Sequence, residues 1–234
     1  MQVEDVIKDL NSYVDKSKAE FLPRFFKTGK GEYGEGDIFI GVVVPNQRLV
    51  AKKYKDLPLP EIQKLLESPI HEQRLTALLI LTYQFPKADE ASQKTIVDFY
   101  LSNTKHINNW DLIDLSSVEI LGNYLLKHPD YKRKLYEFST SKNLWERRIS
   151  IISTFELIRS KEFADSLKIA EILLQDKQDL IQKAVGWMLR EIGKRDLETE
   201  EKFLDQHYKT MPRTMLRYAI EKFTPAKKQH YMGK

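Results

Sequence analysis

The stretch Gln47-Arg48-Leu49-Val50-Ala51 recurs along the chain as Gln73-Arg74-Leu75-Thr76-Ala77. At the position equivalent to Arg74, later helix starts carry Asp111, Arg148, Lys183 and Arg217. The successive spacings are 37, 37, 35 and 34 residues. One helix pair per repeat of this length is typical of a HEAT-like solenoid, because each pair buries its apolar stripe against its neighbours. The repeat therefore predicts an all-α, HEAT-like helical-repeat solenoid, with a plain helical bundle as the alternative.

Apolar spacings of three and four extend the helical prediction to nearly every long segment, and nine prolines punctuate them. The pattern predicts about a dozen helices. Helix starts are indicated at Ser68-Pro69, at Asn109, and at Asn143, where Glu146 completes a capping box. We expect one repeat domain over 1–234, made of N-terminal helices and a glycine-rich loop (1–44), helix-pair repeats (45–223) and a basic tail (224–234).

The composition of the 234 residues excludes several kinds of chemistry. There is no cysteine, so disulfides, Cys-ligated zinc, iron–sulfur clusters and thiol nucleophiles are excluded. The five histidines are scattered without paired ligand spacing, so we predict no metal and no cofactor. No apolar run reaches the length of a bilayer span, and the N terminus is too charged for a signal peptide. We expect a soluble cytoplasmic protein without a membrane partner.

The net charge of +4 is distributed unevenly. Residues 131–148 carry six Lys/Arg against two Glu, and residues 206–234 carry seven against one, which leaves −6 for the other 187 residues. A cationic C-terminal half suits a polyanion-binding surface, and we expect the solenoid's concave face to be basic; a merely solvated basic face is the alternative. The predicted phosphate contacts from these segments are Lys132, Arg133, Lys134, Arg147, Arg213 and Arg217.

A glycine-rich stretch, Gly29 to Asp37, matches the GxGxxG motif of dinucleotide-binding proteins. A helix-like segment precedes it instead of a strand, and Glu32, Glu35 and Asp37 would repel a pyrophosphate. We therefore interpret it as a structured loop whose glycines serve tight turns or close backbone approach.

Asp114 interrupts the apolar stripe of a helix expected over 110–127. That stripe consists of Trp110, Asp114, Val118, Leu121 and Leu125. A carboxylate there must be paired or functional, because unpaired burial is costly; a buried partner for an Arg is the structural alternative. Asp111 lies nearer the helix start, where an acid complements the helix dipole.

Arg148 interrupts the stripe of the next predicted helix, over 143–159. Arg74 sits likewise among apolar residues in its own repeat. A recurring Arg of this kind could be a ladder that hydrogen-bonds carbonyls of the neighbouring repeat, so Arg148 has both a structural and a functional interpretation.

Trp187 projects away from the core stripe of a helix over 179–194 and shares its face with Lys183, Arg190 and Lys194. An aromatic ring among three cations suits a nucleic-acid strand, because the ring contacts sugar or base while the cations take phosphate. A cation–π cluster without function is the alternative.

Several segments together resemble one family. They are Phe25-Phe26-Lys27-Thr28-Gly29 with the following GEYGEGD and GVVVP, the WDLID start at 110–114, LKHP at 126–129, NLWERR at 143–148, and IQKAVGWMLRE at 181–191. The chain resembles the AlkD-like DNA alkylation repair family of HEAT-like-repeat DNA glycosylases over nearly its whole length. The resemblance implies a catalytic set of Trp110, Asp114, Arg148 and Trp187. Phe25 stands where some members carry a tyrosine.

The resemblance also implies an activity and a partner. The reaction would be hydrolysis of the N-glycosidic bond of N3- or N7-alkylated purines in duplex DNA, by a monofunctional enzyme that leaves the lesion stacked. We expect a monomer of bacterial type, associated with the nucleoid when bound to DNA. Two alternatives remain: a non-catalytic HEAT-like module that binds DNA or RNA structures, and a solenoid scaffold for proteins.

Overall fold

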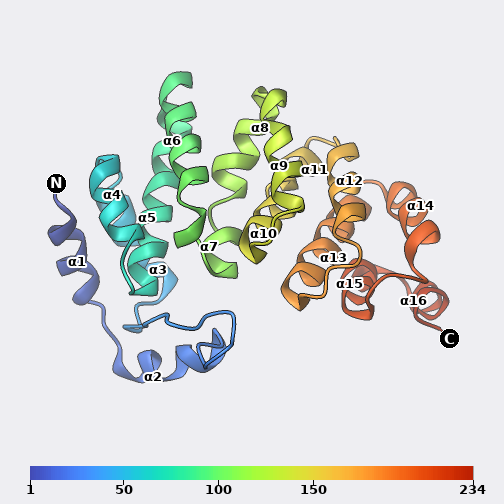
Figure 1. The fold of residues 1–234 in the computed structure, drawn as a ribbon, viewed down its shortest axis with the longest axis horizontal. Helices are drawn as coiled ribbons and strands as arrows, with labels where there is room; N and C mark the ends of the chain where they lie inside the picture. The colour runs from blue at the N-terminus through green and yellow to red at the C-terminus, as the bar shows by residue number, and fades with distance from the viewer. Residues whose placement is uncertain (234) are drawn as a thin grey trace. The chain divides into compact units, whose positions relative to one another are not determined.

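The fold is all-α in residues 1–233, the part of the chain that the structure, a computed structural model, describes (Figure 1). The chain divides into two compact units, Met1–Ile120 and Leu121–Lys234. Each unit has a long central helix with shorter helices around it. The all-α prediction is confirmed, while the concave basic face stays a prediction.

The first unit is built around α5, whose residues 71–81 are all buried. This helix packs against α3, α4 and α7. The elements of the unit are α1 (Val3–Asn11), α2 (Lys16–Phe25), α3 (Val44–Lys53), α4 (Leu59–Leu66), α5 (His71–Gln84), η1 (Phe85–Lys87), α6 (Glu90–Ser102), η2 (Thr104–His106) and α7 (Trp110–Asp114).

The second unit is built around α13, which packs against α10, α14 and α15. Its buried stripe contains the predicted Ile181, Ala184, Val185, Met188 and Ile192. A π-helix, η3 (Val118–Gly122), spans the boundary of the units. The other elements are α8 (Asn123–Lys127), η4 (Pro129–Tyr131), α9 (Lys132–Ser139), α10 (Leu144–Ile152), α11 (Phe155–Arg159), α12 (Ala164–Ile172), α13 (Asp179–Gly193), α14 (Leu197–His207), α15 (Arg213–Ala219), η5 (Ile220–Lys222) and α16 (Pro225–Met232).

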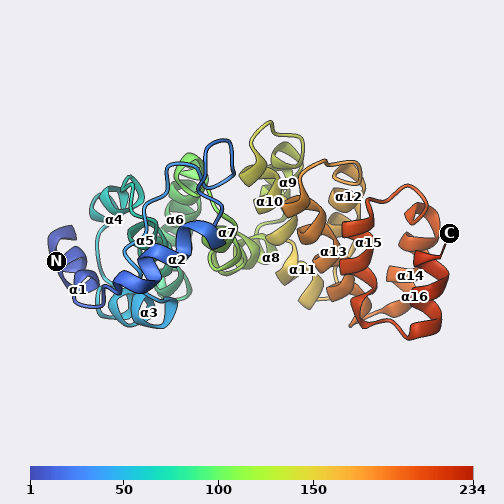
Figure 2. The same cartoon turned by 90° about the horizontal axis from the view of Figure 1, so that it is seen from below.

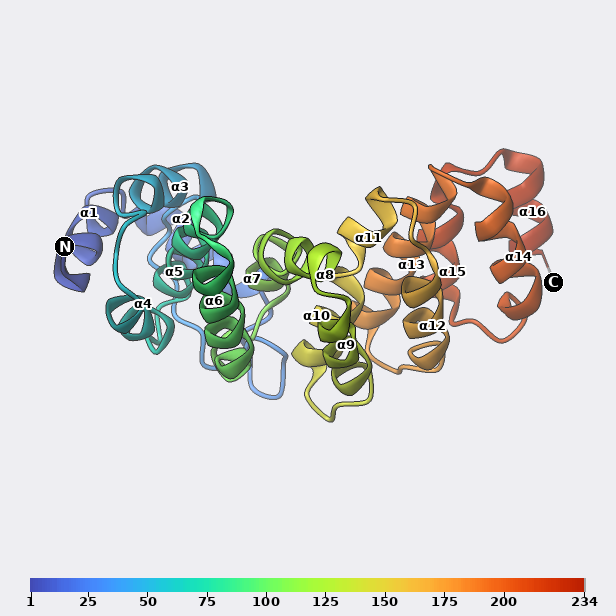
Figure 3. The same cartoon turned by 90° about the horizontal axis from the view of Figure 1, so that it is seen from above.

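Helix α2 is unusual because none of its residues is buried. It lies below α3 and α5 in Figure 1, crosses in front of them in the view from below, and lies behind them in the view from above (Figures 2 and 3). The Asp15 side chain caps its start by accepting the N–H groups of Ser17 and Lys18. The helix therefore covers one side of the first unit without entering its core.

Two predicted helices are each broken in the structure. The segment 110–127 forms α7, a turn, η3 and α8, and within it the Ser116 hydroxyl donates to the Leu112 carbonyl at 2.5 Å. The segment 143–159 is interrupted between α10 and α11, where the Thr154 hydroxyl donates to the Ile151 carbonyl. The apolar stripes were correct, but their continuity was wrong.

The predicted helix starts hold with small corrections. Asn109 caps α7 and Asn143 caps α10. The box at Asn143 closes through a third residue, since Ser141 accepts the Asn143 N–H and donates to Glu146. Helix α5 starts at His71, two residues after Pro69, because Ser68 accepts the Ile70 N–H ahead of the helix.

The glycine-rich stretch is a structured loop, as predicted. Glu32 and Glu35 accept the backbone N–H groups of Gly29 and Gly31, so both acids serve the loop itself. Gly41 has φ +82°, and a Cβ there would lie 2.0 Å from the Asp15 carbonyl oxygen. The loop thus passes directly against the start of α2.

The C-terminal segment predicted as a basic tail, 224–234, contains α16, and Lys234 lies outside the described residues. Among residues 1–233, none of the helices combines the length and the apolar character needed to cross a bilayer.

Candidate active site

Asn109 positions the start of α7 and is fully buried. Its side-chain oxygen accepts the Trp110 N–H at 2.8 Å, and its amide nitrogen donates to Asp37 Oδ2 at 3.3 Å. Asparagine suits this position because its short side chain replaces the partner that the first helical N–H lacks. The cap therefore joins Trp110 to the glycine-rich loop.

A buried ionic network lies beside this cap. His71, at the first position of α5, contacts Asp37 through Nδ1 at 3.0 Å and Asp111 through Nε2 at 2.8 Å. Arg74 donates to the other oxygen of Asp37 at 2.6 Å. Burial opposes a charge on His71, but the two carboxylates outweigh it and raise the pKa of His71 to about 9. At neutral pH two cations therefore balance two carboxylates.

Aromatic rings stack on the network. Phe26 lies parallel to Phe39 on one side and to Trp110 on the other, with centroid distances of 4.9 and 5.4 Å. Phe39 also stacks on His71 at 4.6 Å. The edge of Phe25 meets Trp110 at 5.9 Å, and Phe25 remains 53% exposed. The Trp110 ring is thus held by two phenylalanines next to an exposed aromatic surface.

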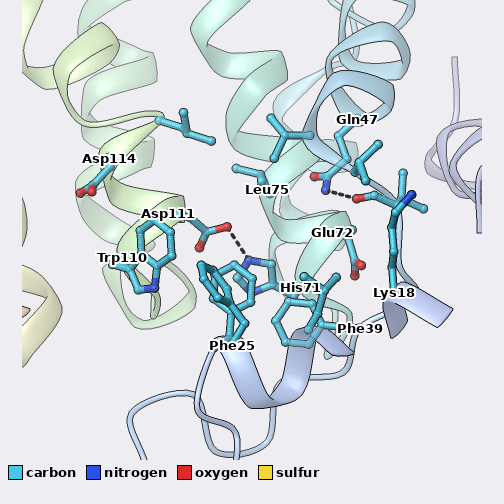
Figure 4. A pocket seen from close by; sticks show the side chains of 16 residues that line it. Lys18, Phe25, Phe39, Gln47, His71, Glu72, Leu75, Trp110, Asp111 and Asp114 are labelled. Atoms are coloured by element: carbon cyan, nitrogen blue, oxygen red, sulfur yellow. Dashed lines mark hydrogen bonds and ion pairs between the residues drawn. The ribbon is translucent and has the colours of Figure 1, made fainter. Parts of the chain in front are cut away.

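A cavity of about 430 Å³ opens beside these rings, with α2, α3, α5 and α7 around it (Figure 4). Its walls are mainly apolar, and Figure 4 shows Asp111 reaching His71 beside Trp110. Asp114 lines this cavity and also a second one of about 210 Å³ with Arg48, Tyr83 and Glu119. A half-buried carboxylate therefore stands between an aromatic cavity and a polar one.

Arg148 lies on α10 in the second unit and is 5% exposed. Its guanidinium donates to the Leu180 carbonyl at 2.5 Å. Leu180 directly precedes Ile181, the first residue of the core stripe of α13. This contact joins two neighbouring helix pairs, as the structural interpretation of Arg148 requires.

Trp187 lies half-buried on α13, and its indole N–H donates to Glu191 at 3.3 Å. The three cations of its face form ion pairs within the unit. Lys183 pairs with Asp179 at 2.7 Å, Lys194 pairs with Glu191 at 2.6 Å, and Arg190 pairs with Glu221. A carboxylate therefore offsets the charge of each of these three cations.

The other predicted phosphate-binding residues also belong to the second unit and differ in their partners. Lys132 pairs with Asp165 and Glu162, Lys134 with Glu137, and Arg147 with Asp176. Arg213 donates to the Met232 carbonyl, and Arg217 donates to Thr214. Arg133 is exposed. Most of these cations therefore already have a polar partner in the unit.

The predicted catalytic residues fall into two pairs. Trp110 and Asp114 share the cavity of the first unit, while Arg148 and Trp187 lie in the second unit on α10 and α13, which pack against each other. Among residues 1–233, no group of three or more His, Asp or Glu side chains is arranged to hold a metal ion.

Sequence analysis missed His71, Asp37, Phe26 and Phe39 as parts of the site. Asp37 was considered only as a repulsive charge in the loop, and His71 only as one of five scattered histidines. A signal was available at the start of α5, where His71 and Glu72 precede a long apolar run; both are buried there.

The fold and the site define a class of protein, an all-α helical-repeat protein with a carboxylate at an aromatic cavity. The chain belongs to a family described as DNA alkylation repair enzyme, whose model matches residues 6–223. No curated protein sequence matches the chain.

Three solved structures share the fold. A predicted DNA alkylation repair enzyme from Enterococcus faecalis is 16% identical, with a TM-score of 0.72 over 91% of this chain and 97% of that one. AlkD2 from Streptococcus mutans is 18% identical, with a TM-score of 0.56 over 95% and 97%. The smu.31 protein from Streptococcus mutans UA159 is 17% identical, with a TM-score of 0.54 over 93% and 95%.

Proposed function

We propose that the protein is a monofunctional DNA glycosylase that hydrolyses the N-glycosidic bond of N3- or N7-alkylated purines in duplex DNA. The observation that carries the proposal is Asp114, a half-buried carboxylate four residues after Trp110 on the wall of an aromatic cavity. Membership of the DNA alkylation repair family supports the substrate class.

The chemistry of the substrate explains why one carboxylate suffices. An alkylated purine is cationic, so when the bond from C1′ to the base nitrogen breaks, the electron pair leaves with a base that becomes neutral. No general acid is needed, and the remaining deoxyribose resembles an oxocarbenium ion. Asp114 stabilises this cation and accepts the proton of the water that adds to C1′.

The aromatic residues have a positioning role in this proposal. Trp110 packs on the sugar of the lesion nucleotide, and its own orientation is fixed by Phe25 and Phe26. Trp187 makes a second contact with the sugar, and Arg148 holds a phosphate or orients the water. The lesion base stays in the stack and is not flipped into the protein.

The basic residues of the second unit supply affinity for the duplex. Their phosphate contacts would replace the ion pairs that Lys132, Arg147 and Lys183 make in the free protein. Exchange of carboxylate for phosphate makes the affinity fall with salt. We infer a monomeric cytoplasmic enzyme without metal or cofactor.

The test is base release from duplex DNA treated with a methylating agent, with identification of the released bases. The parent releases 7-methylguanine or 3-methyladenine, and Asp114→Asn loses roughly 100-fold or more of the rate. Asp130→Asn, an exposed acid on η4, is the matched control and keeps the parent rate. Release by Asp114→Asn at the parent rate would refute the mechanism.

The same experiment separates the enzyme from the alternative of a non-catalytic nucleic-acid-binding module. A parent protein that binds alkylated duplex with a steep salt dependence, yet releases no base, would be such a module. A protein without salt-sensitive affinity for DNA would be neither.

A further inference from the structure

The end of the glycine-rich loop is tied to the start of α5 by several bonds. Ile38 and Ile70 form a parallel bridge, in which the His71 N–H donates to the Ile38 carbonyl at 2.9 Å. Glu72 accepts the N–H of Gly41 at 2.8 Å and that of Ile40 at 3.1 Å. The end of the loop and the start of α5 are therefore joined as one body within the first unit.

The connection from this body to α7 includes fewer hydrogen bonds. Asn109 reaches Asp37, and His71 joins Asp37 on the loop to Asp111 on α7. Asp111 Oδ1 accepts the N–H of Leu112, so Oδ2 is the oxygen directed at His71. His71 is thus the side chain that spans the loop, α5 and α7.

We propose that His71 is a positioning residue, whose imidazolium fixes the start of α7 to the glycine-rich loop and thereby sets the orientation of Trp110 and Asp114. The inference rests on the proposed function for its catalytic consequence. Its structural content, a doubly protonated histidine between two carboxylates, stands on the contacts alone.

Only the charged form of the ring can make both contacts. An imidazolium has two N–H donors, whereas a neutral imidazole has one and directs a lone pair at the other carboxylate. Asp37 keeps Arg74 and Asn109 as donors when His71 is neutral. Loss of the proton therefore weakens the link between the loop and α7.

The charged groups around His71 are of both signs. The carboxylates of Asp37 on the loop, Asp111 on α7 and Glu72 on α5 favour the protonated ring, whereas the cations of Arg74 on α5 and Lys18 of α2 at the cavity oppose it. The carboxylates hold the pKa of His71 at about 9, so the ring is charged at neutral pH.

The position of His71 is transmitted to Trp110 through Phe26. The Phe26 ring lies 5.0 Å from the His71 ring and 5.4 Å from the Trp110 ring. A shift of the imidazole or of Asp111 moves α7 at its first turn, where Trp110 and Asp114 are one turn apart. A displacement of this kind lowers a catalytic rate without removing a reacting group.

The first experiment reads the histidine directly and needs no DNA. Protein labelled with ¹⁵N-histidine is titrated by NMR, and His71 is assigned from the signal missing in His71→Gln. We expect both ring nitrogens of His71 to be protonated at pH 7, with a midpoint near pH 9. Asp111→Asn keeps the size of the side chain but removes its charge, so we expect the midpoint of the His71 titration to fall by about one pH unit or more. A midpoint near 6.5, like that of a free histidine, would overturn the proposal.

The second experiment measures single-turnover base release against pH. We expect the parent rate to fall about tenfold above the NMR midpoint, and this alkaline limb to move to lower pH in Asp111→Asn. His71→Gln lowers the rate at pH 7 without weakening DNA binding, while His106→Gln, in the same unit, matches the parent.

The outcomes of the two experiments separate the two proposals. A parent that releases no base contradicts the proposed function, while the NMR titration still decides the state of His71. A parent that releases base with an alkaline limb unmoved by Asp111→Asn, despite a moved NMR midpoint, overturns the positioning role.

Discussion

Trp110 in the first unit and Trp187 in the second are held in different ways. Trp110 packs against Phe25 and Phe26, and its helix start is joined to a buried ionic network. Trp187 has one ring neighbour, Phe155 at 6.0 Å, and its surroundings are ion pairs along and beside α13. Trp110 is thus joined to buried groups, whereas Trp187 is surrounded by ion pairs that can exchange their partners.

The difference indicates a division of roles between the units. Buried charges with matched partners are costly to rearrange, so the α7 region is suited to hold a reacting group in place. Surface ion pairs contribute little and are easily exchanged, so the α13 region is suited to release its cations to another anion. Four predictions test this difference, from the largest effect to the smallest.

Substitution of Gly41 tests the rigidity of the first unit most severely. Gly41→Ala places a Cβ 2.0 Å from the Asp15 carbonyl oxygen at φ +82°. We expect a loss of about 4 kcal/mol in the free energy of unfolding, from backbone strain and overpacking. Urea denaturation measures it. Gly36→Ala has φ +90° and open space around the added Cβ, so it should cost only about 1 kcal/mol.

The stability of the first unit should depend on pH through His71. Its folded-state pKa of about 9 lies above the value of about 6.5 expected in the unfolded chain. The folded protein therefore holds this proton more tightly than the unfolded chain. Protonated His71 contributes about 3 kcal/mol to the free energy of unfolding, fully below pH 6.5, and this contribution is lost as the pH rises through 9. The stability difference between the parent and His71→Gln should shrink between pH 6 and 10. A difference that grows over this range would contradict the assignment.

Truncation of each tryptophan compares the two environments directly. Trp110→Ala removes two aromatic contacts of a half-buried ring, and we expect a loss of about 2 kcal/mol in the free energy of unfolding. Trp187→Ala removes one distant ring contact and the hydrogen bond to Glu191. We expect it to lower the free energy of unfolding by about 1 kcal/mol. Equal losses of stability for the two variants, in thermal or urea unfolding, would mean that the surroundings of the two tryptophans do not differ in how firmly they hold the ring.

Single charge removals in the second unit should have the smallest effect. Arg133→Ala removes an exposed cation, and we expect DNA affinity to fall a few-fold, with the salt slope reduced by about one. Lys132→Ala removes a cation that pairs with Asp165, so its effect on affinity should be weaker. Fluorescence anisotropy at several salt concentrations distinguishes them. A larger loss for Lys132→Ala would mean that exchange of its carboxylate partner for a phosphate costs little affinity.

Sequence periodicity predicted the helical class and the buried faces because these depend on local spacing. The stripe of α13 and the caps at Asn109 and Asn143 follow from residues within two turns of each other. The breaks in 110–127 and 143–159 were missed because the apolar stripe continues across each break, so helix periodicity does not report it.

The site was only half predictable for a related reason. Asp114 was singled out because a carboxylate in an apolar stripe is a local anomaly, and Trp110 was assigned from the family resemblance. His71 was missed because its significance depends on Asp37 and Asp111, which lie 34 and 40 positions away in the chain. Contacts of that range arise from the tertiary fold and leave no mark in local spacing.

The charge balance at positions 37, 71, 74 and 111 constrains how these positions evolve. Replacement of one member leaves an unbalanced charge in a buried network, so each single step lowers the stability of the fold. Neutral drift at the four positions is then favoured when their changes are concerted. Among relatives of this chain, we expect them to covary as a block, exchanged together for an uncharged set or kept together.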